Sequence, residues 1–310
     1  MSFRTVSLRK KGSAMKIVRY RYKDEEYYGA LKDGAVFSLP ALAESFGEKL
    51  PPKLEVFIEC SSWTLKLAEE LLQKTRNRNV ESVSVLLNDA VLLAPIAYPP
   101  KIICLGRNYV DHSAEMKAPV PDEPVIFMKP HTTIIGPNDK IVKPSMIKEL
   151  DYEGELAVII GKKTKNISVS DAESVIFGYT VFNDVSARDY QFKDGQWTRG
   201  KSFDTFAPTG PCIVTATQLP DTGNLRLRTW VNGELRQNAT TRSMGLDVSQ
   251  IVHHLSRVMT LEPCDIIATG TPAGVGFAMK PPKFLKHGDV VRIEIEGIGI
   301  LENIVEETVE

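Results

Sequence analysis

The sequence lacks a surplus of charge of either sign. Its 310 residues include 38 Lys and Arg against 39 Asp and Glu, so the formal net charge is −1. Nucleic acids and membrane surfaces attract a concentrated basic field, which this balance does not supply. With 43% hydrophobic and 25% charged residues the composition is that of an average globular protein, which excludes disordered and collagen-like chains. We therefore expect no nucleic-acid partner and no membrane partner.

Cysteine is scarce, and long apolar runs are missing. The four cysteines form no CxxC pair and have no zinc-ligand spacing with the histidines, so we expect free thiols and a cytoplasmic location. No apolar run approaches the roughly 18 residues of a membrane span. The chain also contains no GxGxxG, no GxxxxGK[ST] and no internal repeat. Nucleotide-binding folds and repeat architectures are therefore disfavoured.

The first 14 residues contain four basic groups and no acid. Such a segment is compatible with a transit peptide. It has no clear amphipathic stripe, however, and regular structure is first indicated at Met15. We therefore expect residues 1–14 to be a disordered extension.

Residues 15–98 predict a small α+β domain. Alternating apolar and polar residues predict three strands within residues 16–38, and Asp33-Gly34 is a strong hairpin signal. Helices are expected over residues 40–46 and 61–74, the second capped by Ser61 or Ser62. The stiff segment Tyr98-Pro99-Pro100 then favours a domain boundary near residue 98.

Residues 99–310 predict a larger domain that is mostly β. Asn232-Gly233 indicates another hairpin, and one helix over residues 248–260 is expected to be capped by Asp247 or Ser249. Short apolar runs bounded by Gly and Pro predict the strands, at residues 101–105, 125–128, 155–160, 179–184, 212–215, 225–231, 266–269, 290–295 and 298–305. The fold class is therefore α+β, mostly β, and a doubly wound parallel sheet is disfavoured.

Two glutamates stand at the start of one of these strands. In the run DYEGELAVII, Glu153 and Glu155 point to the same face because strand side chains alternate. Carboxylates about 6.5–7 Å apart at the backbone repel each other unless a hard divalent cation lies between them. Asp184 ends another apolar strand and could supply a third ligand. Alone, the pair could equally line a solvated strand face.

Four further polar clusters follow strand ends or form turns, at residues 106–115, 183–191, 197–204 and 270–276. In the first cluster His112 and Glu115 are three residues apart, so on a helical turn they share a face. A histidine oriented by a carboxylate is the arrangement that activates water. Taken singly, each cluster could also be a solvated loop, a surface ion pair or a plain turn.

Together these clusters resemble the fumarylacetoacetate hydrolase family. The family's motifs occur in order, as GRNYxxHxxE, FxKP, ExE, NDxSARDxQ, GKSFDTFxPxGP and GTPxGVG. The match covers about two-thirds of the chain, from Lys101 to Glu306, and is most similar to the type 2 domain-containing members and their bacterial relatives. It implies a mixed β-sandwich or β-roll around one divalent metal, preceded by the small domain. Cys264 departs from the family, which usually has glycine at that turn.

The resemblance also implies roles for individual residues. The metal would be Mg²⁺, with Mn²⁺ or Ca²⁺ able to substitute, and its ligands would be Glu153, Glu155 and Asp184. The catalytic residues would be His112 and Glu115, on a short lid helix, and Lys201. The substrate-binding residues would be Arg188, Gln191, Thr271 and Lys129.

The resemblance leaves the reaction open. The leading hypothesis is a hydrolase that cleaves a C–C bond in a β-diketo acid, such as fumarylacetoacetate or an acylpyruvate, through an enolate and a water activated by the His–Glu pair. The alternative is an oxaloacetate decarboxylase or tautomerase, or a 2-hydroxyhepta-2,4-diene-1,7-dioate isomerase. A non-catalytic binding protein is a third hypothesis. Aromatic catabolism, including tyrosine degradation, is the expected context, and a homodimer is the expected assembly.

Overall fold

A computed structural model describes residues 15–75, 81–117, 119, 121–193, 195–219 and 221–308. The prediction for residues 1–14 lies outside these ranges. No helix within them is both long and apolar enough to cross a membrane. The α-helices are α1 Leu39–Ser45, α2 Leu54–Glu59, α3 Ser61–Lys74, α4 Val110–Glu115, α5 Arg188–Gln191, α6 Thr198–Lys201 and α7 Val248–Val258.

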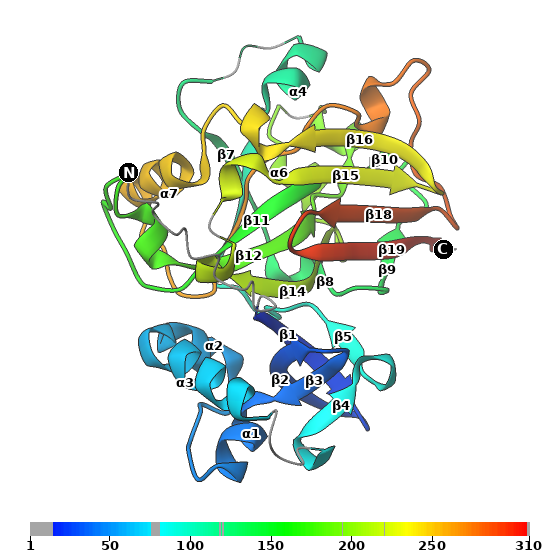
Figure 1. Cartoon of the computed structure of the whole chain (residues 1–310). Helices are drawn as coiled ribbons and strands as arrows, with labels where there is room; N and C mark the ends of the chain where they lie inside the picture. Colours follow the sequence, from blue (N-terminus) through cyan, green and yellow to red (C-terminus); the bar gives the residue numbers. More distant parts are fainter. Residues whose placement is uncertain are drawn as a thin grey trace, which may run out of the picture.

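Most of the strands in the described chain form two large sheets (Figure 1). The larger has the order β4-β3-β2-β1-β14-β12-β11-β17-β6-β7, with β5 on β1 and β8 on β14. Its strands are β1 Lys16–Tyr22, β2 Glu25–Lys32, β3 Ala35–Ser38, β4 Ser84–Leu86, β5 Val91–Leu93, β6 Ile102–Gly106, β7 Val125–Lys129, β8 Ile134–Ile135, β11 Gly154–Ile160, β12 Ile176–Asn183, β14 Ala207–Thr215 and β17 Ile266–Ala268. The mostly-β α+β class is confirmed.

The smaller sheet has five strands among the described residues, in the order β16-β15-β18-β19-β9. They are β9 Lys140–Lys143, β15 Arg226–Val231, β16 Glu234–Thr240, β18 Val290–Ile295 and β19 Gly299–Glu307, and a separate pair consists of β10 Leu150–Asp151 and β13 Ser186–Ala187. The hairpin expected at Asn232-Gly233 joins β15 to β16. Helix α7 begins with a capping box between Asp247 and Gln250, which confirms Asp247 as its cap.

Residues 15–98 form the lower part of the molecule in Figure 1. The hairpin expected at Asp33-Gly34 connects β2 and β3. Helix α3 starts at Ser61, but its N-cap residue is Cys60 and no side chain caps it, so the predicted serine cap is wrong. Strand β1 continues the large sheet by pairing with β14. The large sheet therefore contains strands from both sides of residue 98, so the two expected domains share it. The domain boundary near residue 98 stays a prediction.

Strand β11 lies between two hydrophobic cores. Leu156 and Val158 belong to the core that also contains residues of β15, β18 and α7, whereas Ala157 and Ile159 belong to the core that reaches the helices of the N-terminal part. A strand buried on both faces reads as a continuous apolar run, as LAVII does. The carboxylates that precede this run therefore stand at the edge of a rigid, buried strand.

Gly154 explains the spacing of the two glutamates. A Cβ on Gly154 would lie 2.4 Å from Thr229 Oγ1 of the facing sheet, a distance at which something must shift. The residue between the glutamates therefore has to be glycine for the two sheets to approach. Its neighbours Glu153 and Glu155 both point away from the smaller sheet, toward the same face.

Cys264 has a left-handed backbone, with φ of 70°, and is buried. This conformation favours glycine, the residue usual at that turn in the family that the sequence resembles. The departure therefore affects the backbone strain of this turn, which pairs with Ile160 at the far end of β11 from Glu155.

Candidate active site

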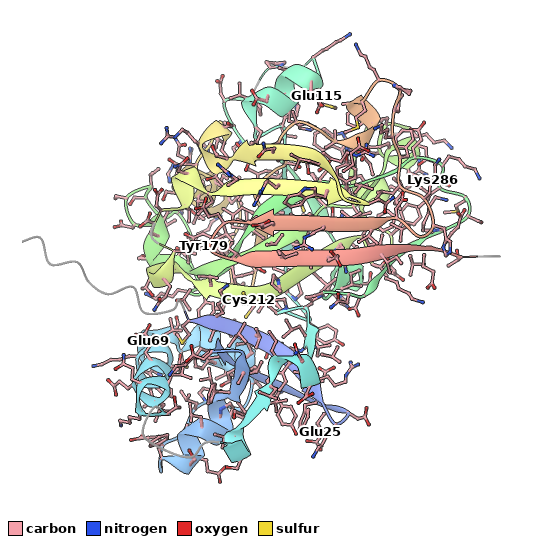
Figure 2. The ribbon with its side chains drawn as sticks, turned by 45° about the vertical axis from the view of Figure 1, so that its right-hand side comes forward. Glu25, Glu69, Glu115, Tyr179, Cys212 and Lys286 are labelled. Atoms are coloured by element: carbon pink, nitrogen blue, oxygen red, sulfur yellow. The ribbon has the colours of Figure 1, made fainter. Side chains whose placement is uncertain are left out.

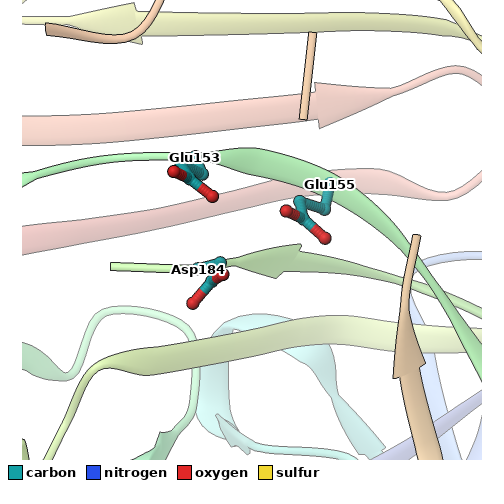
Figure 3. A group of neighbouring side chains, drawn as sticks. All are labelled: Glu153, Glu155 and Asp184. Atoms are coloured by element: carbon teal, nitrogen blue, oxygen red, sulfur yellow. The ribbon is translucent and has the colours of Figure 1, made fainter. Parts of the chain in front are cut away.

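Three carboxylates meet where β11 begins and β12 ends (Figure 3). Glu153 precedes β11, Glu155 is its second residue, and Asp184 follows β12. The two strands are antiparallel with Gly154 opposite Asn183, which brings the three side chains together. One oxygen of each lies within 4.8 Å of the others, and all three residues are buried. The sequence-predicted trio is thus one cluster in space.

Three buried cations surround this cluster. Lys201 Nζ donates to Glu153 Oε2 at 2.9 Å and to Asp184 Oδ2 at 2.7 Å. Lys129 Nζ donates to Asp184 Oδ1 at 2.6 Å. Arg188 Nη1 lies 2.6 Å from Glu153 Oε1. Two of the three carboxylates are therefore neutralised by ion pairs inside the protein.

The guanidinium of Arg188 also binds Asp151, two residues before Glu153. Arg188 Nε donates to Asp151 Oδ2 at 3.0 Å, and Nη1 donates to Gln191 Oε1 at 2.8 Å. Asp151 accepts three backbone N–H groups as well, from Tyr152, Gly276 and Phe277. Asp151 thus fixes the position of Arg188, which in turn fixes Glu153.

The two glutamates have opposite electrostatics. Burial disfavours the charged form of Glu153, but Lys201 and Arg188 outweigh it and lower its pKa to about 2. Burial raises the pKa of Glu155 well above its usual value, and the charges of Asp184 and Glu153 raise it further. No ion pair of Glu155 occurs in the described part of the chain, and its main hydrogen bond comes from the Gly270 amide, at 2.8 Å. The uncompensated negative charge of the site therefore falls on Glu155.

A divalent cation fits this donor set. Glu155 Oε1 is buried and accepts no hydrogen bond from any residue that the structure describes. An unpaired carboxylate oxygen facing two others is an arrangement that a hard cation would satisfy, because such ions bind several carboxylate oxygens at once. Glu153, Glu155 and Asp184 are the residues that could hold it.

A histidine–glutamate pair stands beside the cluster. His112 and Glu115 lie on α4, and Figure 2 places Glu115 at the end of the molecule opposite Glu25 of the N-terminal part. His112 Nδ1 is 3.2 Å from Glu115 Oε2, and His112 is buried. With Nδ1 donating to Glu115, Nε2 is left as a proton acceptor.

The segment Gly270–Gly276 ties these groups together. The amides of Gly270, Gly274 and Gly276 donate to Glu155, Glu115 and Asp151, respectively. Gly274 has a φ of 105°, and a Cβ there would lie 2.1 Å from the Arg236 carbonyl oxygen. In the sequence this segment could have been a plain turn. In the structure it orients Glu155 of the carboxylate cluster and Glu115 of the histidine–glutamate pair.

His112 of the pair and Glu153 of the cluster line the same small cavity. Its volume is about 20 Å³, room for about one water. It is lined by Leu105, Gly106, Arg107, His112, Met116, Phe127, Glu153, Arg188, Gln191, Trp197, Lys201 and Thr271. The lining includes His112, Lys201, Arg188, Gln191 and Thr271, all of which the sequence had suggested.

Lys129 is placed differently. It is fully buried, bonded to Asp184 and to the Val185 carbonyl oxygen, and it does not line the cavity. This position suits support of Asp184 better than contact with a substrate. The Thr271 hydroxyl does line the cavity, but it donates to the Gly154 carbonyl oxygen and accepts from Gln237.

Sequence reasoning gave no role to several residues of the site, among them Asp151, Arg107, Met116 and Trp197. Asp151 shares the alternation of Glu153 and Glu155, so the D-x-E-x-E pattern could have revealed it. Arg107 belongs to the motif GRNYxxHxxE, which could have drawn attention to it. Met116 and Trp197 also line the cavity; Trp197 begins the polar cluster at residues 197–204, but nothing in that pattern gives the indole a role.

Comparisons with known proteins show the family of the chain. Residues 101–306 match the model of the family described as fumarylacetoacetate (FAA) hydrolase, C-terminal. A mitochondrial oxaloacetate tautomerase of Xenopus laevis is 46% identical over 261 residues, covering 84% of this chain and 80% of the relative.

Two solved structures cover nearly all of the chain. A fumarylacetoacetate hydrolase of Exiguobacterium antarcticum has a TM-score of 0.79 at 38% identity, covering 95% of this chain and 100% of its own. A 2-hydroxyhepta-2,4-diene-1,7-dioate isomerase of Mycobacterium marinum has a TM-score of 0.74 at 37% identity, covering 96% and 100%. The chain belongs to the fumarylacetoacetate hydrolase family.

Proposed function

We propose that the protein is a divalent-metal-dependent enzyme that interconverts the keto and enol forms of a 2-oxo dicarboxylic acid, with oxaloacetate the first candidate. The observation that carries the proposal is the carboxylate cluster of Glu153, Glu155 and Asp184 beside the acceptor nitrogen of His112. The similarity to an oxaloacetate tautomerase over most of both chains supports it. The three names reported above all belong to enzymes of dicarboxylic acids.

When bound, a divalent cation would act as a Lewis acid that lowers the energy of an enolised 2-oxo acid. Lys201 keeps its charge near neutral pH, because Asp184 and Glu153 raise its pKa against the effect of burial. It donates two of its three N–H groups to those carboxylates, and the third can donate to the substrate's 2-oxo oxygen.

His112 Nε2 is the group placed to take a proton from the carbon next to the 2-oxo group. Glu115 holds the tautomer, and the Gly274 amide holds Glu115. Burial of His112 keeps bulk water away, so the proton can return to the same substrate. Tautomerisation is complete when the C–H bond has broken and the proton held by His112 has been returned to the 2-oxo oxygen, so no second reactant is needed.

Either an isomerisation or a hydrolysis requires this cavity to open first. With room for about one water, it has to widen at α4 and Trp197 to admit a 2-oxo acid. Hydrolysis of a β-diketo acid is the second candidate, and the His112–Glu115 pair supports it, because such a pair can activate a water that remains. Decarboxylation of oxaloacetate would need neither water nor His112.

The test is an assay of the purified protein with Mg²⁺ or Mn²⁺, following the ultraviolet absorbance of enol-oxaloacetate and of a panel of acylpyruvates and fumarylacetoacetate. We expect equilibration of keto and enol oxaloacetate without carbon dioxide release, and its loss in a chelator. Cleavage of an acylpyruvate faster than tautomerisation would shift the assignment to a hydrolase. Carbon dioxide release at the rate of enol loss would shift it to a decarboxylase.

The homodimer, the metabolic context and the location stay predictions. Light scattering tests the first. For the location, the Xenopus laevis relative is named as mitochondrial. Imaging of the tagged full chain in its own cell would decide between the cytoplasm and an organelle.

A further inference from the structure

Most cations around the cavity are already used by the protein. Arg188 gives Nε to Asp151 and Nη1 to Gln191 and Glu153, and Lys201 pairs with Glu153 and Asp184. These groups neutralise the site's own carboxylates. They therefore leave little positive charge for a second anionic group on a substrate.

Arg107 is different. It lines the same cavity, it is half-buried, and it forms no ion pair with any carboxylate of the described ranges. Its Nε is buried with no hydrogen-bond partner in the described structure. A buried charged N–H without an acceptor is unfavourable, and such groups in proteins call for an explanation.

The backbone holds Arg107 in place at a conformational cost. Its φ is 58°, in the left-handed region, which costs a non-glycine residue on the order of 1 kcal/mol. Its carbonyl oxygen accepts a hydrogen bond from Ser113 Oγ at 3.0 Å, which joins it to helix α4, where His112 lies. An arginine in a strained conformation, with an unused donor at a cavity, indicates a binding role.

We propose that Arg107 binds the second carboxylate of the substrate, the one distant from the 2-oxo acid group, and thereby selects doubly anionic 2-oxo acids over singly anionic ones. The planar guanidinium can hold a carboxylate through two parallel hydrogen bonds. This inference rests on the proposed function for the position of the 2-oxo acid group. It makes Arg107, which has no role in the sequence-based assignment, the residue that selects between substrates. Arg188 does not have that role, because its donors are bound to Asp151, Glu153 and Gln191.

The test uses the Mg²⁺-loaded full chain and two ligand pairs that differ only at the distal group. For turnover the pair is oxaloacetate and its 4-methyl ester. For binding by calorimetry it is N-oxalylglycine and its distal methyl ester, neither of which can enolise to a product. The variants are Arg107→Met and Arg107→Lys, with Arg199→Met as the control, because Arg199 is exposed on neighbouring α6 and does not line the cavity.

In the wild type we expect the dianion to be preferred about 10–100-fold in both pairs, the range of one hydrogen bond to a charged group. Arg107→Met should reduce that preference to within about threefold. Turnover of the oxaloacetate ester and binding of the N-oxalylglycine ester should stay at wild-type values. Arg107→Lys should keep an intermediate preference, because the charge remains without the planar fork. Arg199→Met should leave the preference unchanged.

Two outcomes overturn the proposal. One is a wild type without preference for the dianion, and the other is an Arg107→Met variant that weakens the dianion and the ester equally, which would be a structural effect. Failure of the proposed function looks different. In that case the wild type turns over neither oxaloacetate form, yet still binds N-oxalylglycine more tightly than its ester through Arg107.

Discussion

Carboxylates occur in two contrasting regions of this molecule. On the smaller sheet, Arg228 faces Glu294 and Arg292 faces Glu302 in register, each side chain being about a third or more exposed. In these two pairs each acid has one base, and water screens both charges. At the start of β11 the groups are fully buried, and the acids outnumber the bases. Asp151, Glu153, Glu155 and Asp184 share Lys129, Arg188 and Lys201.

The exposed ion pairs of the smaller sheet add little to stability, whereas the buried carboxylates at β11 are kept despite their cost, which points to a function. Exposed pairs contribute about 0–1 kcal/mol each and can be lost without consequence. A buried acid with no base is costly unless something else neutralises it. At this site Glu155 is that acid, which is why we assign its free oxygen to a cation.

The largest expected effect comes from removing the uncompensated carboxylate. Glu155→Gln keeps the shape of the side chain and leaves no lysine or arginine unpaired, since Glu155 has no ion-pair partner among the residues described. We expect Mg²⁺ binding by calorimetry to be lost and kcat/KM to fall on the order of 10³-fold or more, because a metal ion supplies several kcal/mol. Glu294→Gln is the matched control on the smaller sheet and should retain both. Normal Mg²⁺ affinity in Glu155→Gln would contradict the assignment.

The next effect concerns the proton acceptor rather than the cluster. His112→Ala should lower kcat on the order of 10²–10⁴-fold, the usual size of a general-base contribution, while Mg²⁺ affinity changes little. Glu115→Gln should lower it less, because the histidine remains but loses the group that fixes its tautomer. Steady-state kinetics with oxaloacetate and an acylpyruvate separates the reactions, since decarboxylation needs no acceptor here. A wild-type rate in His112→Ala for both substrates would remove the pair from the mechanism.

The sequence alone predicted the three carboxylates of the cluster, but not which of them are paired with bases. Period-two spacing placed Glu153 and Glu155 on one face, and the end of an apolar run located Asp184. The sequence could not reveal that Lys201 and Arg188 lower the pKa of Glu153 while no base reaches Glu155. Those contacts join strands and helices far apart in the chain. The continuation of the large sheet through β1 and β14 was missed for the same reason.

A smaller effect should appear in the stability of the metal-free protein. The pKa of Glu155 is raised in the folded state, so its contribution to stability is complete below its usual pKa of about 4.5 and is lost as pH rises through the raised value. Metal-free Glu155→Gln lacks this loss. Relative to wild type it should therefore gain stability as the pH rises from 5 to 9, measured by urea unfolding in a chelator.

Adding Mg²⁺ should reverse the order of the two proteins at the alkaline end, because only wild type binds the ion and is stabilised by it. If the difference between them stayed constant with pH, Glu155 would not be the group that carries the excess charge.

The smallest effect is expected on the smaller sheet. Glu294→Ala removes the carboxylate that lies 3.0 Å from Arg228 Nη2 across β15 and β18, while Arg228 keeps its contact with the Trp230 ring and its access to water. The free energy of unfolding should fall by about 0.2–1 kcal/mol, with less loss at high salt, because both charges are already screened.

Glu153→Ala in the metal-free protein should cost about 3–5 kcal/mol, since it leaves Lys201 and Arg188 buried with one acid fewer. Equal losses in the two variants would mean that burial does not distinguish these regions, and the case for a cation at Glu155 would lose its electrostatic basis.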